Sequence, residues 1–422
     1  MEYKESIFNF EIPFKKKTIL YNTYSGALSL IDRPLNQYTK ESERSELAKQ
    51  GFIVDARINE INRLIVERNR ELYTTRIRYL HIEIAPTMNC QAHCWYCFEN
   101  ARTEKHTMAK DVTMDTIEFI KTQILRSQCE ELCLLFFGGE PLLAIEQIMT
   151  IGEAISSYCE SNSIKFHSEI ISNGIAFTSE VADRIIPAIH MSSLQVTLDG
   201  MRATHDKSKG IPCFDRVIEN IVENADKTRI SVRINVSSRN KDEISELVNW
   251  LMVDKGLDGK IRVYLARVDD LDSCEIAAGE RCLDNFSFVD FRNDFIQSAI
   301  KKYKSFVIDD LLPEIKRNYC GYEKVSQIMI GPDGELYRCQ RTIGSRKNAI
   351  GDIYAGSFFS TSELSLIRPL DDSCLSNCNL LPICFGGCPN ERRKGKALTY
   401  CLLKKKQIEK DLFTYVVAKL NG

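Results

Sequence analysis

The sequence predicts an α/β protein whose largest part is an incomplete barrel. Between residues 78 and 305, short apolar runs typical of strands alternate with helical stretches. Six such units in a row imply a parallel sheet with right-handed crossovers, and six suit a partial (β/α)6 barrel better than a closed barrel of eight. Beyond residue 306 this regularity fades and cysteines accumulate. We therefore expect three parts, over residues 1–76, 77–305 and 306–422.

The barrel is expected to use six apolar runs as strands: Tyr79–Ile84, Leu132–Phe137, Lys165–Ile171, Leu194–Leu198, Ser231–Val236 and Arg262–Ala266. The helices expected between them include Met114–Leu125, Ile145–Tyr158, Ser179–Ile189, Phe214–Ala225 and Asp242–Val253. In TIM-like barrels, chemistry takes place at the C-terminal ends of the strands. The residues that follow each run are therefore the first candidates for a site.

The first module reads as a small α+β unit, similar to a winged helix. Thr18–Asn22 and Ala27–Ile31 are expected to pair as a hairpin. Helices are expected at Lys40–Lys49 and Asn59–Leu72, with a short strand, Gly51–Asp55, between them. The unit carries no catalytic constellation, so it is either a binding module or a cap on the next domain.

Composition and charge narrow the class of protein. The chain has 422 residues, of which 44% are hydrophobic and 27% charged, and its formal net charge is −2. This profile is typical of a globular protein and gives no reason to expect nucleic acid or an anionic membrane as partner. The apolar runs are too short to span a bilayer, and the first residues lack the apolar region of a secretory signal. We expect a cytoplasmic protein.

Sixteen cysteines are many for a reducing compartment, where structural disulfides are rare. Three of them fall within eight residues, in Cys90-Gln-Ala-His-Cys94-Trp-Tyr-Cys97, directly after the first barrel strand. A 4Fe–4S cluster normally takes four thiolates, so three leave one iron with the open position that a catalytic metal site needs. Spacing alone also allows a zinc site completed by His93 or by a distant residue.

This Cys-x3-Cys-x2-Cys pattern, with the aromatic Tyr96 before its last cysteine, resembles the signature of the radical S-adenosylmethionine (radical SAM) superfamily. The resemblance implies that Cys90, Cys94 and Cys97 hold a 4Fe–4S cluster and that S-adenosylmethionine (AdoMet) chelates the open iron. In that family one electron cleaves the sulfonium and releases a 5′-deoxyadenosyl radical, which abstracts hydrogen from the substrate. The cofactor carries this chemistry, and the protein positions it.

The second expected strand runs into Gly138-Gly139-Glu140-Pro141, which resembles the family's glycine-glycine-glutamate-proline loop. Glycines allow the backbone to approach a ligand closely. Glu140 could accept a charge-assisted hydrogen bond from the cofactor's ammonium group. The resemblance therefore assigns Tyr96 and this loop to cofactor binding.

Polar residues also end the next strands, and they resemble further segments of the family. The candidates that could bind the ribose and the methionine carboxylate are Asn173, Thr197 and Arg233. Asp199 and Asn235 stand beside them. For all five the alternative is a role as helix cap or turn residue, which Asn, Thr and Asp often play.

Seven further cysteines occupy the C-terminal region, ahead of a last expected helix, Lys404–Leu420. A Gly-x4-Cys motif, Gly334 to Cys339, and the run Cys374-x3-Cys378-x5-Cys384-x3-Cys388 resemble the SPASM domain, which usually has Cys-x2-Cys at the start of that run. The resemblance implies two auxiliary 4Fe–4S clusters. The distal one would be held by Cys374, Cys378, Cys384 and Cys401, and the one nearer the active site by Cys320, Cys339 and Cys388.

The near cluster then lacks one protein thiolate, because two cubanes need eight ligands. The fourth ligand is either an unrecognised protein group, such as a carboxylate, Cys274 or Cys282, or a cysteine of the substrate. The scattered cysteines otherwise read as small buried apolar residues.

SPASM proteins commonly modify peptides and proteins. One branch oxidises sulfatases and uses an Asp after the cysteine of the Gly-x4-Cys motif, whereas here Gln340 follows Cys339 and cannot act as a base. Another branch crosslinks ribosomally made peptides, often through thioethers, after an N-terminal module has bound the precursor by strand addition. We therefore expect a peptide maturase that forms a thioether-type crosslink and receives electrons from a flavodoxin or ferredoxin. The alternatives are a SPASM enzyme acting on a small molecule or protein side chain, and a non-catalytic iron–sulfur or zinc protein.

Overall fold

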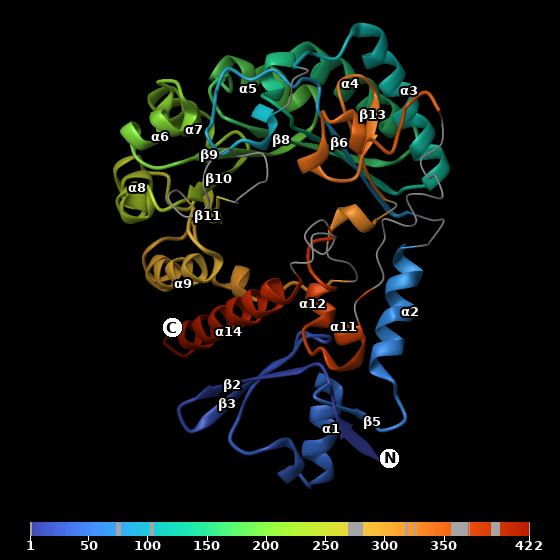
Figure 1. The fold of residues 1–422 in the computed structure, drawn as a ribbon, viewed down its shortest axis with the longest axis vertical. Helices are drawn as coiled ribbons and strands as arrows, with labels where there is room; N and C mark the ends of the chain where they lie inside the picture. Colours follow the sequence, from blue (N-terminus) through green and yellow to red (C-terminus); the bar gives the residue numbers. More distant parts are fainter. Residues whose placement is uncertain are drawn as a thin grey trace.

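The computed structural model describes residues 2–72, 77–101, 105–268, 282–316, 320–324, 326–355, 370, 372–389 and 397–421. The structure has three layers along its long axis (Figure 1). A curved sheet with its helices lies at one end, the C-terminal elements lie in the middle, and the N-terminal module lies at the other end. We retain the predicted three-part division of the chain as a proposal.

The sheet contains the six predicted barrel strands, all parallel, in the order β11-β10-β9-β8-β7-β6. Their bounds are β6 Tyr79–Ile84, β7 Glu131–Phe136, β8 Lys165–Ser172, β9 Met191–Leu198, β10 Arg229–Val236 and β11 Ile261–Arg267. Neighbouring strands in the sheet are also neighbours in the sequence, as right-handed β/α crossovers require. The partial parallel barrel predicted from the sequence is thereby confirmed.

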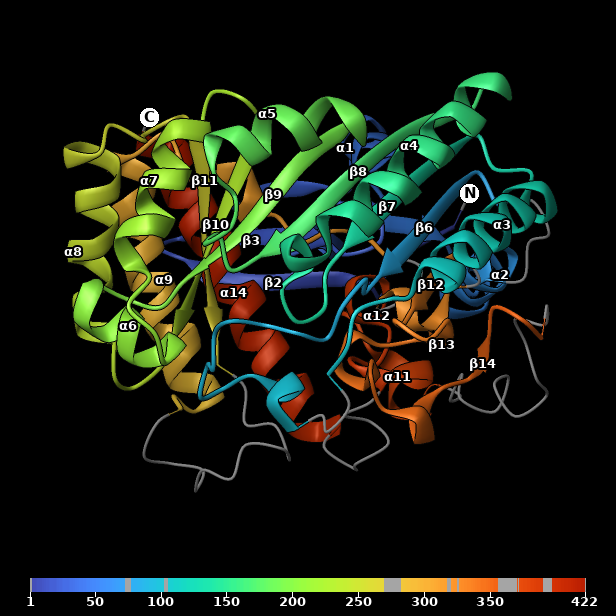
Figure 2. The same cartoon turned by 90° about the horizontal axis from the view of Figure 1, so that it is seen from above.

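Helices cover one face of this sheet (Figure 2). They are α3 Lys110–Ser127, α4 Ile145–Ser161, α5 Ser179–Ala188, α6 Arg202–Lys209, α7 Phe214–Asn224 and α8 Ile244–Asn249, which continues into a π-helical turn, Trp250–Asp254. The sequence did not predict α6. Along β10, Ile230, Val232 and Ile234 point into the core against the helices, whereas Arg233 and Asn235 alternate with them. Because side chains alternate between the faces of a strand, the inner face of the barrel is left for polar residues.

Three strands of the C-terminal region extend the same sheet beyond β6. The first, β12 Gln327–Ile330, pairs in parallel with β6, and it is followed by the antiparallel β13 Glu335–Tyr337 and β14 Gly351–Asp352. This extension was not predicted, since strands of two to four residues carry little periodicity. The helices of this part are α11 Asp372–Asn377, α12 Leu381–Cys384 and α14 Ala397–Asn421, the last of which contains the predicted C-terminal helix. The helix α9 Asn285–Lys302, at the end of the 77–305 part, packs on α14.

The N-terminal module confirms the predicted hairpin and adds a strand to it. An antiparallel sheet in the order β2-β3-β4 is formed by Asn9–Phe14, Lys17–Asn22 and Leu28–Ile31. A second, two-stranded sheet pairs β1 Tyr3–Glu5 with β5 Ile53–Asp55, and the helices are α1 Glu41–Gln50 and α2 Glu60–Leu72. Short 3-10 turns elsewhere lie at Leu35–Gln37, Phe98–Ala101, Pro141–Ala144, Lys241–Glu243, Ile308–Leu311, Gly321–Glu323, Gln340–Thr342 and Arg346–Asn348.

The module packs on the C-terminal elements. Alternate residues of β2, including Phe10 and Ile12, form one hydrophobic cluster with Ile408 and Leu412 of α14. Beside this cluster, Arg68 of α2 forms a buried ion pair with Glu323, at 3.3 Å, three residues after Cys320. The module is therefore joined to the cysteine-rich region both by apolar burial and by a charge pair.

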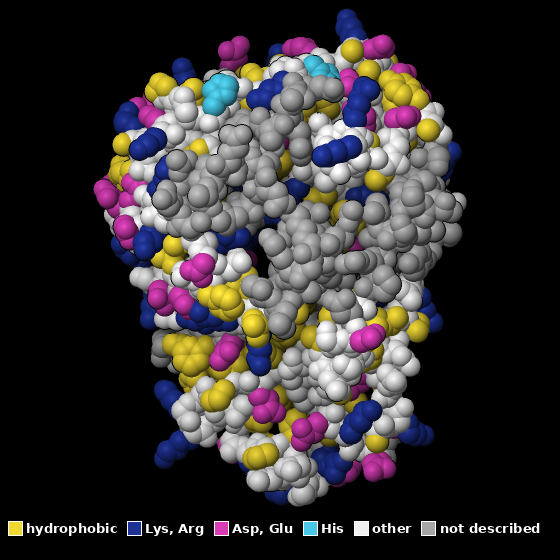
Figure 3. All heavy atoms as spheres, viewed as in Figure 1, with side chains coloured by type: hydrophobic (Ala, Val, Ile, Leu, Met, Phe, Trp, Pro, Cys, Tyr) yellow, Lys and Arg dark blue, Asp and Glu magenta, His cyan; other side chains and the backbone are white. Residues whose placement is uncertain are grey.

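The surface carries charges of both signs. On the face drawn in Figure 3, Lys and Arg side chains are interspersed with Asp and Glu. No helix among the described residues is long and apolar enough to cross a bilayer. The mixture of charges on that face gives no reason to expect a large polyanion to bind there.

Replacing Arg68 by Met should destabilise the junction between the N-terminal module and the cysteine-rich region. The change leaves the buried carboxylate of Glu323 without its cation, at a cost on the order of 3 kcal/mol. Pulse proteolysis of the cluster-loaded protein in increasing urea would measure the loss. The double variant R68M/E323Q, which removes both charges, should regain much of it. A single variant as stable as the wild type would contradict this assignment.

Candidate active site

The carboxyl ends of the barrel strands surround one cavity of about 350 Å³. It collects most of the cofactor-binding residues predicted from the sequence, namely Cys90, Cys94, Tyr96, Cys97, Gly138, Gly139, Asn173, Thr197 and Arg233. Two predicted residues, Glu140 and Pro141, do not line it. Residues from five successive strands, β6 to β10, and from the loops that follow them therefore meet here, because parallel strands end at the same edge of a sheet.

The three-cysteine loop is fixed by its neighbours. The backbone N–H of His93 donates to the carbonyl of Lys209 at 2.7 Å, and that of Trp95 donates to Ser208 at 3.3 Å, so the loop is attached to the C-terminal end of α6. Within the loop, the N–H of Cys97 donates to the carbonyl of Cys94 at 3.0 Å. His93 is exposed and does not line the cavity. The arrangement thus gives no support to a zinc site that uses His93.

The thiols of Cys90 and Cys94 are largely shielded from solvent. Burial raises the pKa of Cys90 to about 11 and also raises the pKa of Cys94. The amide of Asn173 points its Nδ2 at the sulfur of Cys90, at 3.7 Å. A metal cluster would replace the protons of these thiols, since metals bind the thiolate form. The donor set therefore fits an iron–sulfur cluster.

The glycines of the Gly138–Pro141 loop make room for backbone as well as for a ligand. Gly138 has a φ of +121°, and a side-chain carbon there would lie 2.6 Å from the carbonyl oxygen of Thr87. At Gly139 it would lie 2.3 Å from that of Asn89. Both contacts are too close for any larger residue. The loop therefore packs directly on the segment that leads into Cys90.

Glu140 lies behind the cavity, fully buried. Its carboxylate accepts hydrogen bonds from the N–H of Leu142, the hydroxyl of Ser172 and the N–H of Asn173, at 3.1, 2.8 and 2.7 Å. Burial raises its pKa, and these donors oppose the rise. These contacts connect the glycine loop to the end of β8 and orient Asn173. The predicted contact with an ammonium group stays a prediction.

A buried cluster of Tyr96, Asp199 and Lys209 holds the three-cysteine loop in place. The hydroxyl of Tyr96 donates to the carboxylate of Asp199, at 2.8 and 2.9 Å, and the ammonium of Lys209 lies 3.1 Å from the same carboxylate and 3.2 Å from Tyr96. The side chains of Lys209 and Asp199 are only 3% and 2% exposed. Burial alone would lower the pKa of Lys209, but the charge of Asp199 raises it well above its ordinary value.

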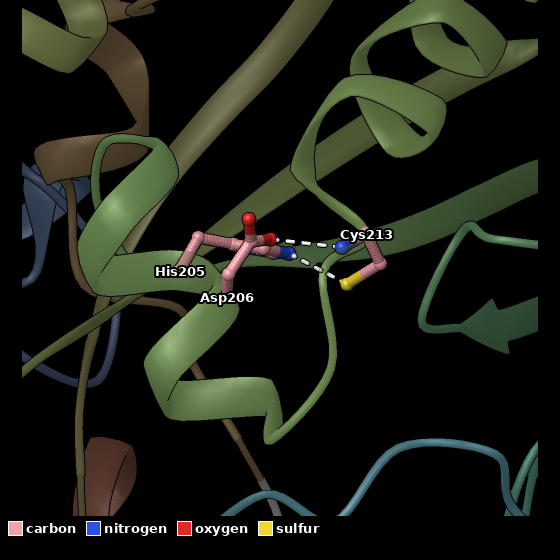
Figure 4. Close-up of side chains that lie close together, drawn as sticks. All are labelled: His205, Asp206 and Cys213. Carbon is pink, nitrogen blue, oxygen red and sulfur yellow. Dashed lines mark hydrogen bonds between the residues drawn. The ribbon is translucent and has the colours of Figure 1, made fainter.

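His205, Asp206 and Cys213 lie close together beside this cluster (Figure 4). Their donor atoms are already engaged. One oxygen of Asp206 accepts from the N–H groups of Cys213 and Phe214, both at 2.8 Å, and Nδ1 of His205 accepts from the N–H of Asp199 at 3.3 Å. Burial lowers the pKa of His205 to about 4. The group holds the turn between α6 and α7 rather than a metal ion.

The match to known families agrees with this geometry. The family model for the radical SAM superfamily matches residues 84–251, the span that contains the three-cysteine loop and the glycine loop. The chain contains a radical SAM domain, which indicates an enzyme. Enzymes of this superfamily use AdoMet and a 4Fe–4S cluster, and the cavity described above holds the residues that suit them.

Several proteins are similar to this chain over most of its length. The radical SAM cyclopropyl synthase TigE of Paramaledivibacter caminithermalis is 23% identical, over 95% of this chain and 89% of its own. The structure of anSMEcpe with AdoMet and the Cp18Cys peptide has a TM-score of 0.62 at 17% identity, covering 81% of this chain and 99% of its own. SuiB of Streptococcus suis with AdoMet has a TM-score of 0.55 at 17% identity, covering 92% and 96%. These two structures share its fold.

The C-terminal cysteines gather into the two groups that the SPASM resemblance implies. Burial raises the pKa of Cys320 to about 12, and the nearby thiols of Cys388 and Cys339 contribute to this rise. Burial likewise raises the pKa of Cys384 to about 11, and the nearby thiols of Cys401, Cys378 and Cys374 contribute to the rise. Which of these cysteines bind iron stays a prediction. The other described cysteines are buried, as expected, at Cys129, Cys133, Cys159 and Cys213, with Cys282 partly buried.

Sequence reasoning missed some of the residues that build the site. Lys209, Arg267 and Arg341 line the cavity, yet none of these three stood out in the sequence. A lysine near the end of a polar helix is normally solvated, so nothing marked Lys209 as buried. The one available signal was its place twelve residues after Thr197, near the end of an adjacent barrel strand.

Replacing Lys209 by Met should empty the barrel site of iron. Without its cation, the buried carboxylate of Asp199 either binds a proton or leaves its place, and Tyr96 loses the contact that holds the loop. We expect the protein to lose about four irons per chain, the content of one cubane. Anaerobic iron and sulfide analysis would measure this loss.

Lys207 provides the control, because it is exposed on the same helix. The K207M variant should keep its iron, and D199N/K209M should recover part of the iron lost in K209M. Full loading of K209M would show that the charge cluster is dispensable for the loop.

Proposed function

We propose that this radical SAM enzyme matures a ribosomally made precursor peptide by installing a crosslink. The observation that carries the proposal is the N-terminal sheet, which packs on α14 and has β4 as one of its two edge strands. An edge strand is where an extended peptide can add to a sheet. The resemblance to SuiB, whose structure has been solved with the precursor peptide SuiA, supports a peptide as substrate.

In this proposal Cys90, Cys94 and Cys97 hold the cluster, and the bound cluster with AdoMet supplies a 5′-deoxyadenosyl radical that abstracts a hydrogen atom. The protein's own contribution is positional. Asn173 is aimed at the sulfur of Cys90, and Tyr96 is held by Asp199. Arg267, Gln340 and Arg341 line the cavity from the end of β11 and from the segment after Cys339. In this proposal Arg267, Gln340 and Arg341 face the bound peptide.

Gln340 argues against sulfatase maturation in this chain. Its amide Nε2 donates to the carboxylate of Glu83 at 2.6 Å, and Glu83 is 2% exposed and does not line the cavity. An amide cannot accept a proton at neutral pH. The described cavity thus has no carboxylate at the position where that branch keeps its base.

Two kinds of crosslink fit the proposal. A thioether consumes a substrate thiol, whereas a cyclopropyl ring, the product named for the relative TigE, forms a bond between carbons. Both remove two hydrogen atoms from the peptide. Mass spectrometry before and after thiol alkylation would separate them, because only a thioether removes a free thiol. We favour the thioether, since the near group of Cys320, Cys339 and Cys388 leaves one ligand position for a substrate cysteine.

The fourth ligand of the near group can be tested directly. Among the described residues, the carboxylates of Glu83 and Glu323 approach these cysteines, but Glu83 accepts hydrogen bonds from Gln327 and Gln340, and Glu323 pairs with Arg68. Cys274 lies outside the described residues. Substituting all six scattered cysteines by Ala should leave every cluster in place. Loss of one cluster from the resting enzyme would rule out ligation by the substrate.

Cys94→Ala should abolish AdoMet cleavage and leave the C-terminal clusters loaded. The change removes a thiolate from the barrel site and touches neither C-terminal group. Anaerobic incubation with AdoMet and reductant, followed by quantification of 5′-deoxyadenosine and iron, measures both effects. Full cleavage by this variant, or a colourless zinc-loaded wild type, would refute the assignment.

Deleting residues 1–76 tests the peptide part of the proposal separately. The truncated enzyme should bind a precursor peptide at least tenfold more weakly. Its barrel cluster and its AdoMet cleavage without peptide should persist even though the cysteine-rich region loses the cover of Phe8 and Phe10, because no described residue that lines the barrel cavity comes from this module. Binding is measured by fluorescence anisotropy of a labelled peptide encoded next to the gene. Equal binding would favour a small-molecule or protein substrate.

A flavodoxin or ferredoxin as reductant, and the reducing cytoplasm as compartment, complete the proposal.

A further inference from the structure

Lys404 lies against the distal cysteine group. It stands on α14 one helical turn after Cys401, so the two side chains share a face of the helix. One turn further along, Ile408 packs in one cluster with Cys384 and Cys378, so this face of α14 is turned to the distal thiols. Burial raises the pKa of Cys384, the thiols of Cys401, Cys378 and Cys374 raise it further, and the charge of Lys404 lowers it. One lysine therefore adjoins the group of four cysteines.

No partner of Lys404 is found in the described part of the chain. It forms no hydrogen bond and no ion pair there, although burial lowers its pKa. The charges around it are mostly of its own sign, from Lys316 and Arg292. The single acid nearby, Asp411, is already bound to Arg292 at 2.6 Å.

A partly buried cation without a counter-ion is unfavourable, because desolvation is not repaid by a charge pair. Its neighbours on the same helix show the usual solution: Lys406 and Lys410 both reach Asp290 of α9, at 2.6 and 2.7 Å. Lys404 lies instead on the face of α14 that packs on the distal thiols. A 4Fe–4S core bound by four thiolates carries a net negative charge and would provide the missing anion.

We propose that Lys404 is the counter-cation of the distal iron–sulfur cluster and holds its reduction potential at a higher value. An added electron is more stable near a fixed positive charge, and net charge is one of the determinants of cluster potentials. This inference rests on the auxiliary cluster of the proposed function and is independent of which peptide the enzyme modifies.

The test uses the full chain with Cys90, Cys94 and Cys97 replaced by Ala, so that only the C-terminal clusters contribute signals. Midpoint potentials are measured by redox titration followed by electron paramagnetic resonance. K404M should move one of the two midpoints to a more negative potential and leave the other unchanged. K404R, which keeps the charge, and K405M, which removes the exposed charge next to it, should leave both midpoints in place.

Loss of about four irons per chain in K404M, with full loading in K404R and K405M, would also support the proposal, because the arginine retains the charge. Unchanged midpoints in K404M, or an equal shift in K404R, would overturn it while leaving the clusters and the peptide proposal intact. Absence of a second C-terminal cluster from the parent protein would overturn both this inference and the auxiliary-cluster part of the proposed function.

Discussion

The ion pair between Asp199 and Lys209 is the contact on which the active site depends. It joins the end of β9 to the end of α6, and through Tyr96 it reaches the three-cysteine loop. Two charges removed from water gain stability only if their remaining hydrogen-bonding capacity is satisfied. Here Tyr96 satisfies both, by donating to the carboxylate and accepting from the ammonium. The cluster thus fixes a loop that has no regular secondary structure of its own.

The rest of the site follows from parallel topology. Because all six strands end at one edge, each loop can support the next, and Glu140 shows how. Its carboxylate belongs to the second loop, yet it is saturated by donors from its own turn and from the end of β8. The carboxylate therefore orients Asn173, which faces Cys90. The glycine loop, which resembles a ligand-binding motif, therefore also connects the ends of two adjacent strands, β7 and β8, by hydrogen bonds.

Periodicity and spacing were sufficient to predict the barrel. All six strands lie within three residues of their predicted bounds, because a buried parallel strand is a short run of apolar residues and the chain repeats it six times. Prediction failed where the signal is short or tertiary. β12 has four residues and gains its stability by pairing with β6, which no local pattern reveals. Lys209 looks solvated in sequence, and only the position of Asp199 makes its burial favourable.

The cysteine-rich region depends on its neighbours for a core. Its described helices α11 and α12 are short, and the clusters that bury them include side chains of the N-terminal module: Phe10 and Ile12 of β2, Phe8 just before it and Leu64 of α2. Cys374 and Cys384 are themselves members of these clusters. A region with so little core of its own needs either metal or a partner surface to fold, and this one is built to use both. Removal of the metal should therefore loosen the N-terminal module as well, because the same side chains pack against the ligands and hold the sheet whose edge strand is β4.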